Sequence, residues 1–244
     1  QSPSSAASDV YKRQMVDSGA NSFYVFEDGK KKFYDINTKK YKTVPSSENH
    51  YILDAFRENK QILKNPECTV HDIGDGVMCI EFQTKGNSIG EGIAKGINEA
   101  IDIAEKDGWN GIVIGNNDKQ FSVGANLMNM GMMAMQKNFD EIEKFLVGFQ
   151  KILMRMRTCN VPVVSATHGF VLGGGLEVSI HCDAGIHASE SYIGLVEAGV
   201  GLIPGGGGTK EMAMRASDSF NSGDVKMPSF CLLYTSPSPR DPSI

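Results

Sequence analysis

Residues 168–177 read HGFVLGGGLE, an apolar run that ends in three glycines and continues as a helix-like run from Leu176 to Cys182. Without Cβ atoms, the backbone of Gly173, Gly174 and Gly175 can approach a ligand closely and leave N–H groups uncommitted. The following helix N-terminus presents about half a positive charge. The stretch therefore suits an oxygen atom that becomes negative during a reaction, although a tight turn is the simpler interpretation of the triplet alone.

Strands and helices alternate along the chain on either side of this stretch. Apolar residues at helical spacing predict helices over 89–106 and 139–157. Short apolar runs predict strands over 77–82, 111–114 and 162–166, and the second of these is of the kind buried on both faces. This alternation predicts an α/β domain with mainly parallel strand pairing.

Two further glycine-rich segments flank the first. Residues 121–127 read FSVGANL, where Gly124-Ala125 offers a second flexible loop whose N–H groups could point at the same oxygen. Residues 195–209 read LVEAGVGLIPGGGGT, and the run 205–208 most simply predicts a flexible turn into a helix. None of the three segments fits a dinucleotide fingerprint, a phosphate-binding loop or a nucleophile elbow.

Two glutamates are the candidate acid and base. Glu177 falls in the first turn of the predicted helix, where a carboxylate suits the helix dipole, and Glu197 follows a strand-like run over 192–196. Two carboxyl groups can share proton transfers if a desolvated pocket raises their pKa values toward neutrality. From spacing alone, two surface charges explain them equally well.

Together these three segments resemble the signature of the crotonase superfamily, the enoyl-CoA hydratases and isomerases. The resemblance covers about residues 69–230 and implies an α/β fold built as a spiral of ββα units, incomplete here at its C-terminus. It implies that Ala125 and Gly174 supply the two N–H groups of an oxyanion hole. The neighbouring positions that would contact substrate are Gly124, Asn126, Gly173 and Gly175. Asn126 departs from the aspartate usual in the family.

The same resemblance implies hydration of trans-2-enoyl-CoA to 3-hydroxyacyl-CoA in fatty acid β-oxidation. Glu177 would hold and activate water and Glu197 would protonate the α-carbon, with the division shared. The substrate would be an acyl-CoA, hydration would need no cofactor or metal, and the full-length parent would be a homo-oligomer. The alternatives are a 3,2-enoyl-CoA isomerase that relies mainly on Glu197, and a non-catalytic domain that binds acyl-CoA or holds an oligomer.

Residues 15–66 do not resemble crotonase. An Asp28-Gly29 pair between aromatic, β-prone runs predicts a hairpin, and residues 51–63 predict a short amphipathic helix. The region resembles the connector of fused β-oxidation proteins in which an NAD-dependent 3-hydroxyacyl-CoA dehydrogenase precedes the hydratase. NAD would then serve that upstream domain. The lysines at 39, 40 and 42 fit a solvated hairpin face better than a phosphate contact.

The two ends have a different origin in this interpretation. Residues 4–14 and 231–241 read as translations of transposase-type sequencing adapters in inverted orientation, although two unstructured polar tails are the alternative. We therefore expect adapter-derived tails at 1–14 and 231–244, a connector at 15–66 and a truncated hydratase core at 67–230. We expect the fragment by itself to be inactive.

Composition limits the remaining classes. A formal net charge of −5 gives no basic footprint for nucleic acid, and no run reaches the ~18 apolar residues of a membrane span. The cysteines at 68, 79, 159 and 182 suit buried thiols in a reducing compartment, so we expect a cytoplasmic protein, with the mitochondrial matrix as alternative. His168, His181 and His187 with Asp183 make only a weak metal pattern. The methionines over 128–135 predict either an acyl-chain pocket or an apolar helix on the core.

Overall fold

The computed structural model describes residues 3–27, 30–45, 51–56 and 60–221. The chain divides into two compact units, Gln1–Gln61 and Ile62–Ile244, each described here by itself. The division falls close to the change of character expected at residue 66. The predicted tail at 231–244 and the expected truncation after residue 230 lie outside the described residues.

The first unit contains the predicted hairpin. Strands β1 and β2 pair antiparallel, with Tyr24 opposite Phe33 and Glu27 opposite Lys30, while the Asp28-Gly29 turn lies outside the described residues. A third strand continues the sheet, so that Lys42 reaches Asp35 as an ion pair. The elements of this unit are α1 (Pro3–Asp17), β1 (Tyr24–Glu27), β2 (Lys30–Asp35), β3 (Lys40–Thr43) and the short 3-10 helix η1 (Leu53–Ala55). Helix α1 runs across the tail boundary expected at residue 14.

The amphipathic helix predicted over 51–63 is wrong. Among the described residues of this stretch, 51–56 and 60–63, only η1 is helical, and β4 (Gln61–Lys64) is an edge strand of the large sheet. Asn65 explains the change, because its side-chain Oδ1 accepts hydrogen bonds from the amides of Glu67 and Cys68 and so builds a turn between β4 and β5. Ile62 and Leu63 pack against the core from the strand. Sheet pairing overrides the local helical spacing.

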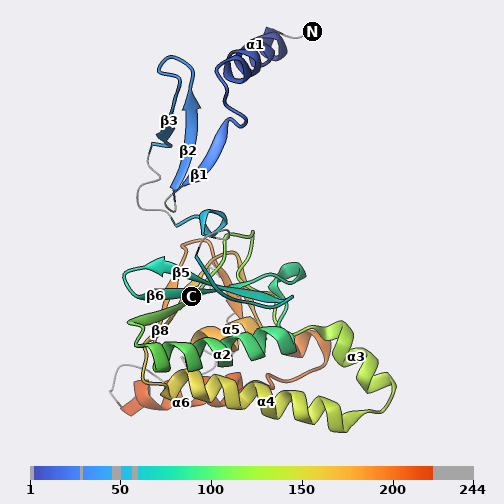
Figure 1. Ribbon diagram of the computed structural model, residues 1–244. Helices are drawn as coiled ribbons and strands as arrows, with labels where there is room; N and C mark the ends of the chain where they lie inside the picture. The colour runs from blue at the N-terminus through green and yellow to red at the C-terminus, as the bar shows by residue number, and fades with distance from the viewer. Residues whose placement is uncertain (1–2, 28–29, 46–50, 57–59, 222–244) are drawn as a thin grey trace. The chain divides into compact units, whose positions relative to one another are not determined.

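The second unit is an α/β domain (Figure 1). After β4 its elements are β5 (Cys68–Gly74), β6 (Val77–Phe82), η2 (Lys85–Asn87), α2 (Glu91–Asp107), β7 (Gly111–Ile114), α3 (Leu127–Met135), α4 (Phe139–Thr158), β8 (Val163–Thr167), β9 (Phe170–Leu172), α5 (Gly174–Ile180), β10 (Ala184–His187), β11 (Tyr192–Gly194), η3 (Glu197–Val200) and α6 (Gly208–Asn221). The helices and strands predicted over 77–166 are confirmed to within two residues at each end.

Six strands form the main sheet in the order β10-β8-β7-β6-β5-β4. The pairs β10/β8, β8/β7 and β7/β6 are parallel and β5/β6 is antiparallel. A second, two-stranded sheet pairs β11 with β9 in parallel. The predicted parallel pairing is therefore confirmed, and it brings the carboxyl ends of several strands to one edge of the sheet.

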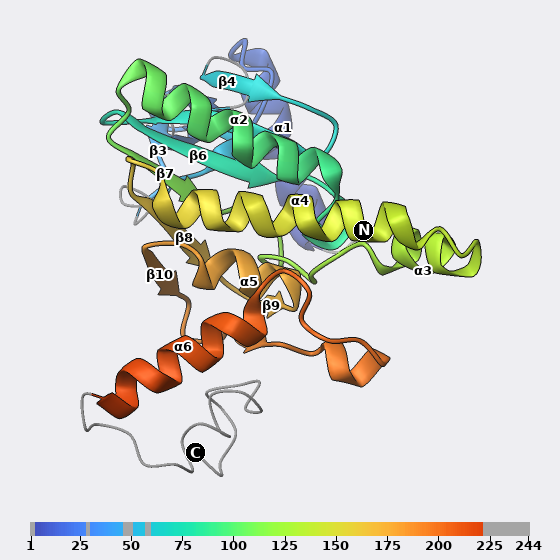
Figure 2. The same ribbon diagram turned by 90° about the horizontal axis from the view of Figure 1, so that it is seen from below.

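Helices α2 and α4 lie side by side across one face of the main sheet (Figures 1 and 2). Helix α2 buries Ile93, Ile97 and Ile101, and α4 buries Leu153 and Met156, all in one cluster with the inward side chains of β5 to β8. Burying each such side chain contributes about 1.5–3 kcal/mol. This core fixes the sheet edge from which the glycine-rich loops leave.

Candidate active site

The three glycine-rich segments lie together, with β9 in the middle. The amide of Ser122 donates to Phe170 O over 2.9 Å, and Leu172 N returns a bond to Ser122 O over 3.0 Å. On the other side of β9, Gly173 N donates to Gly194 O over 2.9 Å, which joins the segment at 168–177 to the one at 195–209. Segments far apart in sequence thus form the walls of one site.

The amides of Ala125 and Gly174 are neighbours. A Cβ placed on Gly174 would lie 3.4 Å from Ala125 N, and one on Gly124 would lie 3.2 Å from Gly174 N. Gly124 has φ +96° and Gly173 has φ +50°, backbone conformations that favour glycine. Within the described part of the chain, neither Ala125 N nor Gly174 N has a hydrogen-bond acceptor. Two uncommitted donors in adjacent loops can bind one oxygen atom.

Glu177 is held by the turn at the start of α6. Its side chain is 3% exposed, and its Oε1 accepts a hydrogen bond from Gly208 N over 2.9 Å. Burial raises the pKa of this carboxyl group, the amide of Gly208 opposes the rise, and the negative charge of Glu197 adds to it. The backbone amides of Gly206 and Gly207 also lower the pKa of this carboxyl group.

Glu197 enters the same site from the first residue of η3. Its Oε1 would lie 2.9 Å from a Cβ on Gly173, so the Glu197 carboxyl group lies close to the backbone of that glycine. Its Oε2 is buried and has no hydrogen-bond partner among the described residues. Burial raises the pKa of the Glu197 carboxyl group. The charge of Glu197 also acts on Glu177, so the two carboxyl groups lie within electrostatic range of each other.

The other residues predicted to contact substrate have different surroundings. Asn126 caps α3, with its Oδ1 accepting from Asn129 N over 3.4 Å. An aspartate would accept the same bond, so the departure from the family pattern keeps the cap. Gly175 lies against Ser122, whose Cβ would be 2.7 Å from a Cβ on Gly175, so this glycine permits close packing of α5 on the first loop.

The methionine-rich segment forms α3, which buries none of its residues. Met128 is 77% exposed and Met135 is 88% exposed. The predicted alternative of an apolar helix packed on the core is therefore wrong. The reason is that the helix leaves the first glycine loop outward and contacts α4 only in part.

The three histidines have unrelated partners. His168 Nε2 lies 2.6 Å from Asp118 O, His187 Nδ1 lies 2.6 Å from Thr167 Oγ1, and His181 Nδ1 lies 2.7 Å from Glu177 O. Among the described residues, no group of three His, Cys, Asp or Glu side chains is arranged to hold a metal ion. The weak metal pattern in the sequence does not come together in space.

Sequence reasoning missed two features of this site. The run Gly205–Gly208 leads into α6 as predicted, but it also supplies the donors that hold Glu177. The fully buried Glu211 lies behind that run and contacts Arg157 and His181. Their positions at 157, 181 and 211 carry no shared motif, so no sequence signal connects them.

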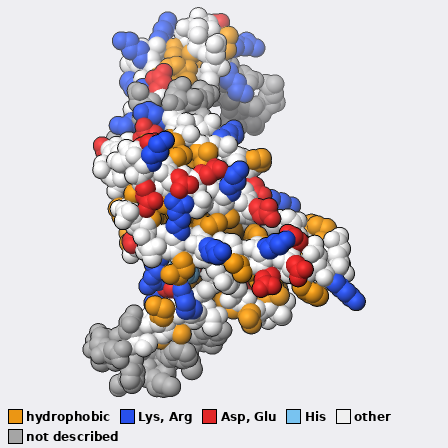
Figure 3. Space-filling view, turned by 60° about the horizontal axis from the view of Figure 1, so that its bottom comes forward, with side chains coloured by type: hydrophobic (Ala, Val, Ile, Leu, Met, Phe, Trp, Pro, Cys, Tyr) orange, Lys and Arg blue, Asp and Glu red, His pale blue; other side chains and the backbone are white. Residues whose placement is uncertain are grey.

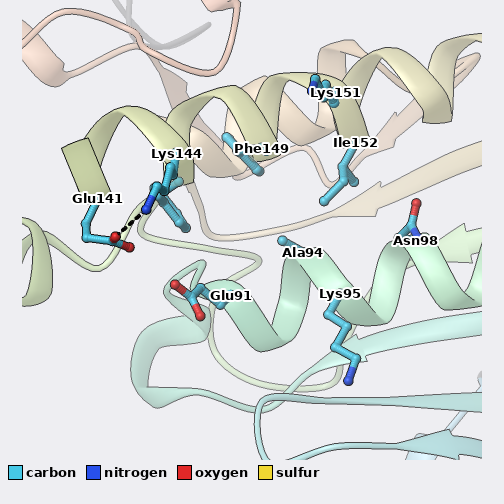
Figure 4. A pocket seen from close by; sticks show the side chains of 11 residues that line it. Glu91, Ala94, Lys95, Asn98, Glu141, Lys144, Phe149, Lys151 and Ile152 are labelled. Atoms are coloured by element: carbon cyan, nitrogen blue, oxygen red, sulfur yellow. Dashed lines mark hydrogen bonds and ion pairs between the residues drawn. The ribbon is translucent and has the colours of Figure 1, made fainter.

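A groove of about 480 Å³ lies on the outside of the second unit, between α2 and α4 (Figure 4). Its floor includes Ala94, Phe149 and Ile152, and lysines and glutamates stand along its edges. It contains neither candidate glutamate. Lysine, arginine and acidic side chains are interspersed on the face shown in Figure 3. No described helix is long and apolar enough to cross a membrane.

Comparisons with known proteins were made for the whole chain. The profile of the family described as Enoyl-CoA hydratase/isomerase matches residues 72–222. The "Probable 3-hydroxyacyl-CoA dehydrogenase" of Bacillus subtilis is 39% identical over 201 residues, covering 82% of this chain and 25% of that protein. The "Short-chain-enoyl-CoA hydratase" of Clostridium acetobutylicum is 36% identical over 102 residues, covering 42% of this chain and 38% of that protein.

Among solved structures, an enoyl-CoA hydratase from Polaromonas sp. JS666 is similar with a TM-score of 0.62 and 21% identity. The match covers 70% of this chain and 63% of that one. A second, from Geobacillus kaustophilus, has a TM-score of 0.57 and 24% identity over 70% of this chain and 68% of that one. These likenesses concern the fold. The chain spans about a quarter of the length of the Bacillus relative.

Proposed function

This chain belongs to the enoyl-CoA hydratase/isomerase family, with the crotonase fold in its second unit, and from that premise we propose that it carries an enoyl-CoA hydratase site. The observation that supports this most is that the buried Glu177 and the half-buried Glu197 accompany two uncommitted amides. The reaction is addition of water to the double bond of a trans-2-enoyl-CoA to give a 3-hydroxyacyl-CoA.

The amides of Ala125 and Gly174 would bind the thioester oxygen. As water adds to the β-carbon, electrons of the double bond move toward the carbonyl and the oxygen gains negative charge. One well-aimed donor at such an oxygen contributes roughly 3–4 kcal/mol to the barrier reduction. Gly124 and Gly173 would let both amides approach because their positive φ values turn the two loops toward each other.

The glutamates would divide the proton transfers. Glu177, as carboxylate, would accept a proton from the attacking water, whose oxygen bonds to the β-carbon. Glu197, as carboxylic acid, would deliver a proton to the α-carbon on the same face, and the two groups exchange one proton before the next turnover. Burial supports this division, because two carboxyl groups in one poorly solvated region favour a state with a single negative charge.

Replacement of each glutamate tests the proposal. The assay follows loss of the 2-enoyl chromophore of trans-2-butenoyl-CoA, with this chain and with the longer protein proposed below. Because each carboxyl group handles a proton, Glu177→Gln and Glu197→Gln should each lower kcat by roughly 10²–10⁴-fold. Asn126→Asp is the matched control and should retain activity, since its carboxylate keeps the α3 cap. Near-wild-type turnover in both glutamine variants contradicts the assignment.

An isomerase is the second candidate, and one observation favours it. Glu177 is occupied by the glycine amides, whereas Glu197 Oε2 has no partner among the described residues. A 3,2-enoyl-CoA isomerase would rely mainly on Glu197 to move a proton between two carbons. Offering a 3-enoyl-CoA distinguishes the two, because faster conversion of that substrate than hydration of the 2-enoyl-CoA assigns the isomerase. Tight acyl-CoA binding without turnover would instead assign a non-catalytic domain.

We also propose that this unit belongs to a longer β-oxidation protein with a 3-hydroxyacyl-CoA dehydrogenase. The support is the Bacillus relative, of which the chain spans about a quarter. In that protein, the connector would be residues 15–66 and the hydratase core would begin at residue 67. NAD would serve the dehydrogenase, the protein would form a homo-oligomer, and bacterial relatives favour the cytoplasm. Coupled conversion of 2-enoyl-CoA to 3-ketoacyl-CoA with NAD reduction is the test.

A further inference from the structure

A polar cluster around the buried Glu211 lies directly behind the turn that holds Glu177. It consists of Arg157 on α4, His181 directly after α5 and Glu211 on α6, and all three helices are labelled in Figure 2. The Glu211 side chain is 0% exposed and its Oε2 pairs with Arg157. Its Oε1 lies 3.0 Å from Lys210 Nζ and 3.5 Å from His181 Nε2. A carboxylate withdrawn from water needs cationic partners, which Arg157 and Lys210 supply, and the Arg157 contact joins α4 to α6.

His181 connects this group to the backbone of Glu177. Its Nδ1 lies 2.7 Å from Glu177 O, and because a carbonyl oxygen only accepts, Nδ1 carries the proton. The opposite nitrogen of the ring faces Glu211. A Cβ on Gly207 would lie 3.3 Å from His181 Cε1, so the ring also lies against the glycine turn.

Glu211 reaches the same turn through its own backbone. Its amide donates to Gly207 O over 3.0 Å, one residue before Gly208, whose amide donates to the Glu177 carboxyl group. Helix α4 supports the turn from another side, because Gln150 Nε2 donates to Gly205 O over 2.6 Å. A run of four glycines has little conformational preference of its own, so its amides keep their aim only if neighbouring groups fix it.

We propose that Arg157, Glu211 and His181 act as positioning residues, which fix the glycine turn so that the amide of Gly208 stays aimed at the Glu177 carboxyl group and those of Gly206 and Gly207 stay near it. This inference rests on the proposed role of Glu177 in hydration. Within the described part of the chain, Arg157, Glu211 and His181 form no hydrogen bond with the amides of Ala125 and Gly174. They should therefore influence the proton affinity of Glu177 far more than the binding of the thioester.

Loss of the cluster's contacts should change the pKa of Glu177 in one direction. The three amides lower the pKa of Glu177 against the effect of burial. If the turn loses its aim, the pKa of Glu177 should rise further, so that less of it is ionised at neutral pH. The hydration rate then falls at neutral pH, and the acidic limb of its pH profile moves to higher pH, while KM changes little.

The direct test is a titration of Glu177 in this chain, followed by NMR of ¹³C-labelled glutamate carboxyl carbons and assigned with Glu177→Gln. In Glu211→Gln and in Arg157→Gln, the proton affinity of Glu177 should rise by about three- to tenfold. In the hydration assay, kcat at neutral pH should fall by roughly tenfold, with KM within about twofold of wild type.

Arg155→Gln is the matched control. Arg155 is on the same helix, but it bonds Asn98 and pairs with Asp102 and Glu105 on α2. Its loss should lower the thermal midpoint and leave the Glu177 titration unchanged, as a merely structural role predicts. If the Glu177 titration is also unchanged in folded Glu211→Gln and Arg157→Gln, the inference is overturned.

A replacement variant and an activity measurement complete the test. Should Glu211→Gln and Arg157→Gln not fold, Arg157→Lys replaces them, because an ammonium group cannot reproduce the guanidinium contact and a smaller rise is still expected. An unchanged Glu177 titration in Arg157→Lys then overturns the inference. Absence of turnover in the longer wild-type protein contradicts the proposed function alone, since the titration needs no catalysis.

Discussion

At the scale of single residues, the carboxyl group of Glu197 has an oxygen whose hydrogen bonding the fold does not satisfy. Its Oε2 is buried without a partner among the described residues, and burial raises its pKa. A carboxyl group with a raised pKa binds its proton more tightly in the folded than in the unfolded state. Folding stability is then lost as pH rises from the unfolded pKa, about 4.3, through the folded pKa. Glu197 therefore costs stability at neutral pH, as expected of a group kept for chemistry.

The variant Glu197→Gln should consequently be more stable than wild type at pH 7. We expect its thermal midpoint to rise by about 1–3 °C, a small gain because the side chain is partly exposed and solvent screens its charge. Below pH 4 the carboxyl group is protonated in both states, and the two midpoints should converge. Thermal melts at both pH values measure this. A midpoint difference that is independent of pH would show that packing, not charge, separates the variants.

At the scale of elements, the sequence predicted the helices and strands whose regularly spaced apolar residues are buried in the core. Ile93, Ile97 and Ile101 predicted α2, and they are buried in the cluster. The helix expected over 51–63 failed because β4 gains its stability from pairing with β5, a long-range term that local spacing does not contain. Sequence could likewise suggest both glutamates and both amides. It could not suggest Glu211 with Arg157, since that contact depends on how α6 crosses α4.

Helix α3 offers an element whose stability depends mainly on its cap. It buries no residue, so few contacts replace the bond from Asn129 N to Asn126 Oδ1. Asn126→Ala should lower the local stability of α3 by about 0.5–2 kcal/mol, whereas Asn126→Asp should preserve it. Hydrogen exchange of the α3 amides measures this change, while α2 amides should keep their protection in both variants. Equal exchange in the alanine and aspartate variants would mean that α3 does not depend on this cap.

At the scale of the whole molecule, the site depends on one core in the second unit. The loop with Ala125 leads into α3, which packs against α4, and α4 also supports the glycine turn below Glu177 through Gln150. The single tryptophan, Trp109, is partly buried against this core. Its fluorescence therefore reports the unfolding of the second unit without a signal from the first.

Leu153→Ala should destabilise this unit strongly, because the side chain is fully buried on the inner face of α4 and its loss leaves a cavity. The expected cost is about 2–5 kcal/mol in the free energy of unfolding, measured by urea denaturation with Trp109 fluorescence. Met154→Ala is the control. The Met154 side chain is 40% exposed, so its truncation should cost far less free energy of unfolding. Equal losses in the two variants would contradict the inward orientation of Leu153. Because α4 also carries Gln150 and Arg157, Leu153→Ala should lower hydration at temperatures where the unit is still mostly folded.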